Sequence, residues 1–157
     1  NGAFTPGEFT IAIWGKVASA GVWTDATARR LFRIRADGSN MIDAYRTATN
    51  NQLEIDYIAG GTAKGAQFLS GGVTSFFHVA VTVSKSGDAV KLYFNGAQQG
   101  ATLTGLGTWV GALNATACNI GASTQAPASV WSGSLAHFAI WNTPLSAAQI
   151  ATLASVP

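Results

Sequence analysis

Apolar and polar residues alternate along most of this chain with the two-residue period of a β-strand. The clearest case is residues 76–96, where two alternating runs are separated by Ser86-Gly87-Asp88 and followed by Asn95-Gly96. Asn and Gly tolerate the positive φ angles of tight turns, so this stretch predicts a β-hairpin. The same alternation predicts further strands at residues 9–17, 30–36, 41–46, 53–58 and 134–141.

The alternation also predicts which side chains are buried, because every second residue of a half-buried strand faces the core. The expected core consists of Phe9, Ile11, Ile13, Phe32, Ile34, Ile55, Phe77, Val79, Val81, Val83, Leu92, Phe94, Phe138, Ile140 and Ile150. In the strand at residues 30–36, Leu31, Arg33 and Arg35 are expected on the opposite face from Phe32 and Ile34.

A short helix is predicted near the C-terminal end of the sequence. Ser146 and Gln149 have the spacing of a capping box, in which each side chain bonds to the backbone N–H of the other residue. Leu145 and Ile150 are placed to form the hydrophobic staple that accompanies such a cap.

Composition indicates one domain, residues 1–157, with enough apolar residues (48%) for a sizeable core. Only 10% of residues are charged and the net charge is +2, which argues against a nucleic-acid partner. No apolar run has the length of a transmembrane segment, so membrane insertion is not expected.

Cys118 is the single cysteine, so an intrachain disulfide is excluded. We expect Cys118 to pack as a small apolar residue. The sequence starts at Asn1 instead of Met, which suggests processing or a piece of a longer polypeptide.

Several segments resemble the laminin-G-like, concanavalin A-like lectin/glucanase family of jelly-roll domains. The matching segments are FHVAVTV, LYFNG, NIGAS and WSGSLAHFAIWNTPLSAAQIATL in the second half, and more loosely FTIAIWGKV in the first. The resemblance implies an all-β, concanavalin A-like jelly-roll sandwich of two antiparallel sheets with one short C-terminal helix. It also implies a binding module more than an enzyme, although fold alone does not determine function.

Calcium is bound at a rim by many members of this family. Calcium prefers six to eight oxygen ligands, roughly, including carboxylates. The seven acidic residues of this chain are scattered, and Asp25 and Asp88 are the least implausible ligands. The two histidines, His78 and His137, lack the spacing of a zinc site. We therefore expect no cofactor, with calcium as the alternative.

A glycoside hydrolase is the enzymatic alternative, because the family's hydrolases carry an E-x-D-x-x-E or E-x-D-x-E motif on one strand. Glu54 and Asp56 match its first two carboxylates, but Tyr57, Ile58 and Ala59 supply no third. Retaining hydrolysis needs a nucleophile and a separate proton donor. We therefore expect no enzyme, and a polar outer sheet face instead.

Carbohydrate binding is the preferred hypothesis. Trp14 and Tyr93 alternate with the apolar side chains of their strands, so they are expected to face outward, where sugar rings stack on aromatic side chains. The side chains expected to supply hydrogen bonds from the same face are Arg33, Arg35, Tyr45, Glu54, Asp56 and His78. The same face could instead be solvated or covered by a protein partner.

Two functions follow from these expectations. The first is non-catalytic recognition of a cell-surface or polymeric carbohydrate by an extracellular, cell-surface or virion-borne protein. The second is a decoration or fibre subunit of a phage virion or surface assembly that contacts other proteins, with a homo-oligomer as one arrangement. The low charge of the chain suits the second, because symmetric packing would cover uncharged surface.

Overall fold

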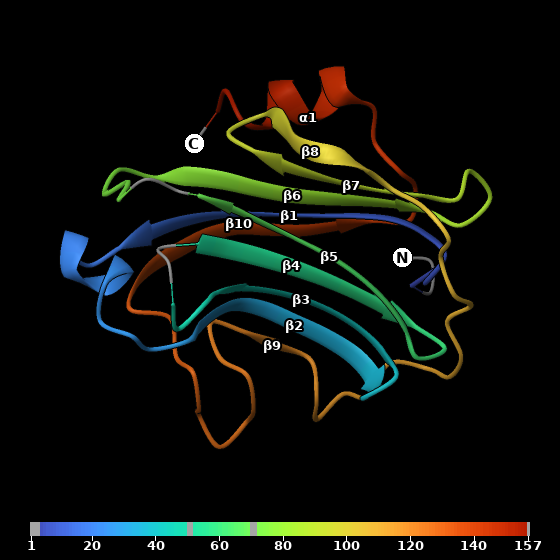
Figure 1. Ribbon diagram of the computed structural model, residues 1–157, viewed down its shortest axis with the longest axis horizontal. Coiled ribbons are helices and arrows are strands. Elements are labelled where there is room, and N and C mark those ends of the chain that lie inside the picture. The colour runs from blue at the N-terminus through green and yellow to red at the C-terminus, as the bar shows by residue number, and fades with distance from the viewer. Residues whose placement is uncertain (1–3, 50–51, 70–71, 157) are drawn as a thin grey trace.

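The computed structural model describes residues 4–49, 52–69 and 72–156, and these form two stacked five-stranded antiparallel sheets (Figure 1). Sheet A has the order β10-β1-β6-β7-β8, with β1 (Glu8–Val17), β6 (Phe77–Ser84), β7 (Ala89–Phe94), β8 (Ala97–Leu103) and β10 (Gly133–Trp141). Sheet B has the order β5-β4-β3-β2-β9, with β2 (Arg29–Asp37), β3 (Asn40–Arg46), β4 (Gln52–Ala59), β5 (Thr62–Leu69) and β9 (Asn119–Ile120). The predicted jelly-roll sandwich is confirmed.

The predicted hairpin joins β6 and β7, with Val81 opposite Leu92 and Val83 opposite Val90. The turn after β7 uses Asn95 and Gly96, whose φ angles are +48° and +82°. Two successive positive φ angles are the feature of the tight hairpin turn that Asn-Gly favours. The sequence therefore predicted both the strands and the turn correctly at this position.

The core lies between the sheets and contains most of the predicted residues. Phe94 and Phe138 are only partly buried, and Ile140 was predicted wrongly, because 39% of it is exposed. Ile140 lies on β10, an edge strand of sheet A. The edge strands β5 and β8 contact each other at one side of the sandwich. At the other side, β10 is the edge strand of sheet A, and the edge strand of sheet B is β9, which has only two residues. This short strand leaves part of β10 uncovered.

Leu31 departs from the predicted alternation of β2. The pairing of β2 with β3 is interrupted by a bulge between Arg30 and Phe32. A bulge places an extra residue in one strand and so breaks the two-residue period. Leu31 and Phe32 consequently both belong to the core and are both fully buried, although Leu31 was expected on the outer face.

Two helices accompany the sheets: η1 (Ala20–Trp23), a 3₁₀ turn after β1, and α1 (Ala147–Leu153). The predicted capping box of α1 is present, with Ser146 and Gln149 bonded to each other as expected. Figure 1 shows α1 on the side of sheet A that faces away from sheet B. There Ile150 packs against Ala12, Ala80 and Tyr93. Small alanine side chains on the sheet allow the helix to approach closely.

Four elements were not predicted: β5, β8, β9 and η1. Strand β5 has the sequence TAKGAQFL, whose apolar side chains are small or sparse, and β8 (AQQGATL) is similarly polar. Both are edge strands that hydrogen-bond to a well-predicted neighbour, so their pairing, more than their own composition, determines their conformation. No helix in the described part of the chain has the length and hydropathy needed to cross a bilayer.

Candidate functional site

The predicted binding residues divide between the two outer faces of the sandwich. Trp14, His78 and Tyr93 lie on the outer face of sheet A, where Trp14 pairs with His78. The others lie on the outer face of sheet B, on three adjacent strands: Arg33, Arg35, Tyr45, Glu54 and Asp56. The prediction that all eight share one face is therefore wrong. Alternation within a strand separates inward from outward residues, but it does not assign a strand to a sheet.

The sheet A group is largely covered. Tyr93 is 1% exposed because it packs under α1, and Trp14, whose ring lies 5.2 Å from that of His78, is 8% exposed. Beside them is a hollow of about 350 Å³ between the sheet and the end of α1, lined also by His137, Trp141 and Leu153. Its walls are mostly apolar. Tyr93 thus lacks the open ring face that the stacking hypothesis required, and Trp14 reaches the surface only at the wall of this hollow.

His78 is 2% exposed, and no ion pair within the described residues favours its charged form. Burial lowers the pKa of His78 to about 4, so the ring is neutral near pH 7. Its Nδ1 atom is buried and has no hydrogen-bond partner among the described residues. The residue therefore acts in the structure as a packed ring, and acidification disfavours the folded state at this position.

On sheet B, a buried carboxylate is held beneath two guanidinium groups. Arg30 donates through Nε to both carboxylate oxygens of Asp43, at 3.2 and 3.1 Å. Arg33 donates to the same carboxylate through Nε, at 3.2 Å, and through Nη2. The Asp43 side chain is only 1% exposed, whereas those of Arg30 and Arg33 are 15% and 14% exposed. Asp43 therefore fixes the two arginines, which form the surface above it.

Tyr45 connects this ion-pair cluster to strand β4. The guanidinium carbon of Arg30 lies 4.3 Å from the centre of the Tyr45 ring, a cation–π contact. The Tyr45 hydroxyl donates to Asp56 Oδ2 at 3.1 Å. Burial, reinforced by the charge of Asp56, raises the pKa of Tyr45 above its usual value. The hydroxyl thus keeps its proton and remains a donor.

Asp56 and Glu54 lie at adjacent outward positions of β4. Burial is the main cause that raises the pKa of Asp56 to about 6, and the negative charge of Glu54 adds to it. Asp56 lies over Gly65 of β5, where a Cβ atom would come within 2.2 Å of Asp56 Oδ1. Glu54 accepts a hydrogen bond of 2.7 Å from the Gln67 side chain. Gly65 therefore provides the space that the Asp56 carboxylate occupies.

Arg35 completes the outer face of sheet B. It lies opposite Met41 in the β2–β3 register and is partly exposed. Within the described ranges, its guanidinium has no ion pair or hydrogen bond. We refer to the outward residues of this face as the polar array: Arg30, Arg33, Arg35, Asp43, Tyr45, Glu54, Asp56 and Gln67.

Three members of the polar array were not predicted as site residues. Arg30 and Asp43 are charged residues within predicted strands, which is a signal that the sequence contains. Their position next to Arg33 on the outer face follows only once the β2–β3 register is known. Gln67 lies on β5, which the sequence did not predict as a strand.

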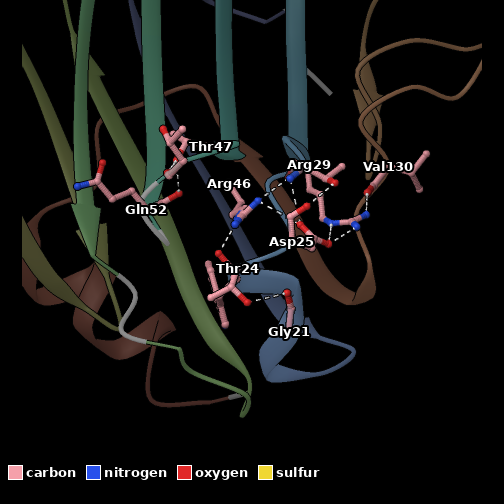
Figure 2. A network of polar contacts seen from close by, with 11 residues as sticks. Gly21, Thr24, Asp25, Arg29, Arg46, Thr47, Gln52 and Val130 are labelled. Atoms are coloured by element: carbon pink, nitrogen blue, oxygen red, sulfur yellow. Dashed lines mark hydrogen bonds and ion pairs between the residues drawn. The ribbon is translucent and has the colours of Figure 1, made fainter.

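The two weak calcium candidates are engaged by protein groups. Asp25 is paired with Arg29 and, at 3.2 Å, with Arg46 (Figure 2). In Figure 2, Asp25 lies between these two arginines at the end of the sheet. Asp88 accepts the backbone N–H groups of Gly105 and Leu106, both at 2.8 Å. In the described part of the chain, no three His, Cys, Asp or Glu side chains gather as metal ligands would.

Comparison with protein families matches residues 1–151 to a model described as the concanavalin A-like lectin/glucanases superfamily. The chain belongs to this superfamily. The match covers nearly the whole sequence, and it agrees with the strand order of the two sheets. A search of curated protein sequences found no significant match.

Three solved structures illustrate the fold relationship. Domain 4 of AbnA, a GH43 extracellular arabinanase from Geobacillus stearothermophilus solved with arabinotriose, has a TM-score of 0.68 and 17% identity; the alignment covers 94% of this chain and 66% of that one. The CBM40 of a Ruminococcus gnavus IT-sialidase, bound to α2,3-sialyllactose, has a TM-score of 0.70 and 16% identity, with 97% and 84% covered. A heptameric SAP-like pentraxin from Limulus polyphemus has a TM-score of 0.66 and 17% identity. That alignment covers 94% of this chain and 70% of the pentraxin chain. At these identities the likeness concerns the fold.

Proposed function

We propose that this chain is a non-catalytic carbohydrate-recognition domain whose ligand lies on the polar array of sheet B. The observation that carries the proposal is the link through Tyr45, whose ring supports Arg30 while its hydroxyl holds Asp56. Sugars are bound by fixed polar side chains around an aromatic surface. Two fold relatives were solved with saccharides, arabinotriose and sialyllactose, which supports this class of ligand.

The polar array is pre-organised, which favours binding. Asp43 holds Arg30 and Arg33, and Gln67 holds Glu54. Side chains that are already fixed lose less conformational entropy when a ligand arrives. Because one of the fold relatives belongs to an extracellular enzyme, we place this recognition outside the cell, at a cell or virion surface.

A hydrolytic role fits the same residues less well. Retaining hydrolysis needs a nucleophile and a proton donor about 5 Å apart. Asp56, with a pKa of about 6, has the character of a proton donor, and Glu54 lies beside it. Their separation by one residue places both on the same strand, and the third carboxylate, Asp43, is closed off by two arginines. We therefore assign the carboxylates to hydrogen bonding with sugar hydroxyls.

Contact with other proteins of an assembly is the second candidate. It is favoured by three exposed apolar side chains near the β9 and β10 edges: Ile120 at 52%, Val130 at 45% and Ile140 at 39%. Exposed apolar residues at a sheet edge are typical of surfaces that associate. A solution mass of more than one chain, reduced to one chain by Ile140→Ser, would support this candidate.

A glycan array with the purified chain tests carbohydrate recognition, followed by titration calorimetry with the strongest ligand. Tyr45→Ala removes the central ring of the polar array and should weaken binding at least about tenfold, as the loss of a well-placed contact of roughly 1.4 kcal/mol would. Phe76→Ala is the matched control, because Phe76 is an exposed aromatic residue (41%) beside Trp14 on the sheet A side. Equal affinity for wild type and Tyr45→Ala would contradict the proposed site.

A further inference from the structure

The polar array separates its charges across the strands of sheet B. Its arginines, Arg30, Arg33 and Arg35, all lie on β2. Its carboxylates that no arginine pairs with, Glu54 and Asp56, lie on β4, two strands away. Asp43 on β3 lies between them and is the ion-pair partner of two of the arginines. The polar array therefore holds three guanidinium groups on β2 and one carboxylate that pairs with two of them, which leaves an excess of positive charge on the β2 side.

The arginines also keep unused hydrogen-bond donors. A guanidinium has five N–H groups in a planar fork. Asp43 takes only Nε of Arg30, and it takes Nε and Nη2 of Arg33. In the part of the chain that the structure describes, both Nη groups of Arg30, Nη1 of Arg33 and the whole guanidinium of Arg35 make no hydrogen bond. Water satisfies these donors only while the face is uncovered.

A ligand that covers the β2 side must replace that water. A neutral sugar offers hydroxyl groups, which are weak acceptors for charged donors. A carboxylate or sulfate accepts bidentate, charge-assisted hydrogen bonds from arginine, which are roughly twice as strong as neutral ones. Covering unpaired cationic donors with a neutral group carries a desolvation cost that an oxyanion avoids. The β2 side is thus matched to an anion.

The β4 side has the opposite preference. Asp56 and Glu54 are acceptors of hydroxyl protons, and an anion placed over them would be repelled. Tyr45 lies between the two sides, with Arg30 against its ring and Asp56 on its hydroxyl. A saccharide with one acidic group would fit both halves in a single orientation, with its oxyanion over β2 and its neutral hydroxyls over β4.

We infer that the ligand of the polar array is an acidic saccharide, one that carries a carboxylate or sulfate, and that Arg35 with the free N–H groups of Arg30 and Arg33 binds its anionic group. This inference rests on the proposed function and adds the ligand class. Arg35 is the main determinant because its donors are not shared with Asp43. Arg30 and Arg33 are the positioned partners on either side of the buried carboxylate.

The experiment uses a glycan array with matched neutral, carboxylated and sulfated glycans, followed by calorimetry on the strongest ligand and on its neutral counterpart. Binding should be confined to acidic glycans, with carboxylated and sulfated members distinguishing the two sources of the anion. Arg35→Gln should lower affinity for the acidic ligand at least about tenfold, as the loss of charge-assisted hydrogen bonds predicts. Arg35→Lys keeps the charge without the fork and should restore part of the affinity.

Lys91→Gln is the control, because it removes the same charge from the outer face of sheet A, where Lys91 pairs with Thr82. Melting temperatures of all variants verify folding. One outcome would overturn the acidic ligand and keep carbohydrate recognition. In it, neutral and acidic glycans bind equally well, Tyr45→Ala weakens this binding, and Arg35→Gln leaves it unchanged. An array without any bound glycan would overturn both. Acidic binding that Lys91→Gln weakens as much as Arg35→Gln does would also overturn the inference.

Discussion

The Tyr45 hydroxyl on β3 donates a hydrogen bond to Asp56 Oδ2 on β4, with 3.1 Å between the two oxygens. This bond favours the ionised form of Asp56, yet the pKa of Asp56 is raised to about 6. Burial is the largest cause, and the charges of Glu54 and Asp43 act in the same direction. The strand pair thus holds a carboxylate that exchanges its proton near neutral pH.

Asp56→Asn tests this raised pKa. Because the folded-state pKa of Asp56 exceeds the usual aspartate value of 3.8, folded Asp56 binds its proton more tightly than unfolded Asp56. Wild-type stability at this site therefore falls as pH rises from about 4 to 6. The variant lacks this loss. We expect its free energy of unfolding, relative to wild type, to increase between pH 4 and pH 7 by about 1–2 kcal/mol, after allowance for partial exposure.

Urea unfolding at several pH values measures that difference. The control is Asp37→Asn, because Asp37 is exposed and its pKa is lowered, not raised. Its relative stability should change in the opposite direction, because hydrogen bonds from Asn40 and Ser39 lower the pKa of Asp37. A pH-independent difference for Asp56→Asn would contradict the raised pKa.

Gly65→Ala should destabilise the protein through Asp56. The added Cβ would lie 2.2 Å from Asp56 Oδ1 and 3.2 Å from the Ile55 carbonyl oxygen, so the carboxylate must move. We expect a loss of about 1–3 kcal/mol, as for an overpacked site. Gly38→Ala is the control, because nothing lies within 4 Å of its Cβ position. Thermal unfolding compares the variants, and equal stability of both would show that the space over Gly65 is not needed.

His78 should make the protein less stable in acid. Its folded-state pKa is lowered from 6.5 to about 4 by burial, so the unfolded chain binds the proton more readily, and stability is lost as pH falls through that interval. In His78→Gln this dependence is absent. The stability advantage of wild type over the variant should shrink by roughly 2–3 kcal/mol between pH 7 and pH 4.5. Denaturant titrations at both pH values measure it. His137→Gln serves as the comparison, because His137 lines the same hollow but is exposed. An unchanged gap for His78→Gln would contradict the assignment.

The periodic strands and the capped helix were predictable because their signals are local. Val79 and Val81 alternate with polar residues, and Ser146 and Gln149 are three positions apart. The errors arose where a neighbouring element decides the outcome. Leu31 is buried because of a bulge opposite β3, and Ile140 is exposed because its strand lies at an edge. Neither the bulge nor the edge position can be recognised from the local sequence.

The candidate site was predictable only in part, for a related reason. Tyr45 and Asp56 were correctly expected to point outward, since each alternates with buried neighbours. Trp14 also points outward, but from the other sheet, where its ring packs against His78 and is 8% exposed. Asp43 was missed because its role depends on Arg30 and Arg33 lying one strand away. Sheet register is the information that alternation lacks.

Ser146→Ala should weaken the attachment of α1 to sheet A. The Ser146 hydroxyl accepts the Gln149 N–H at 3.3 Å, and α1 places Ile150 over Tyr93. Loss of an N-cap of this kind costs about 1 kcal/mol, which lowers the melting temperature of a domain this size by about 2–4 °C. Ser19→Ala is the matched control, because Ser19 precedes η1 without a side-chain cap bond. Calorimetric melting compares them. Equal melting temperatures for the two variants would show that the capping box does not hold the helix on the sheet.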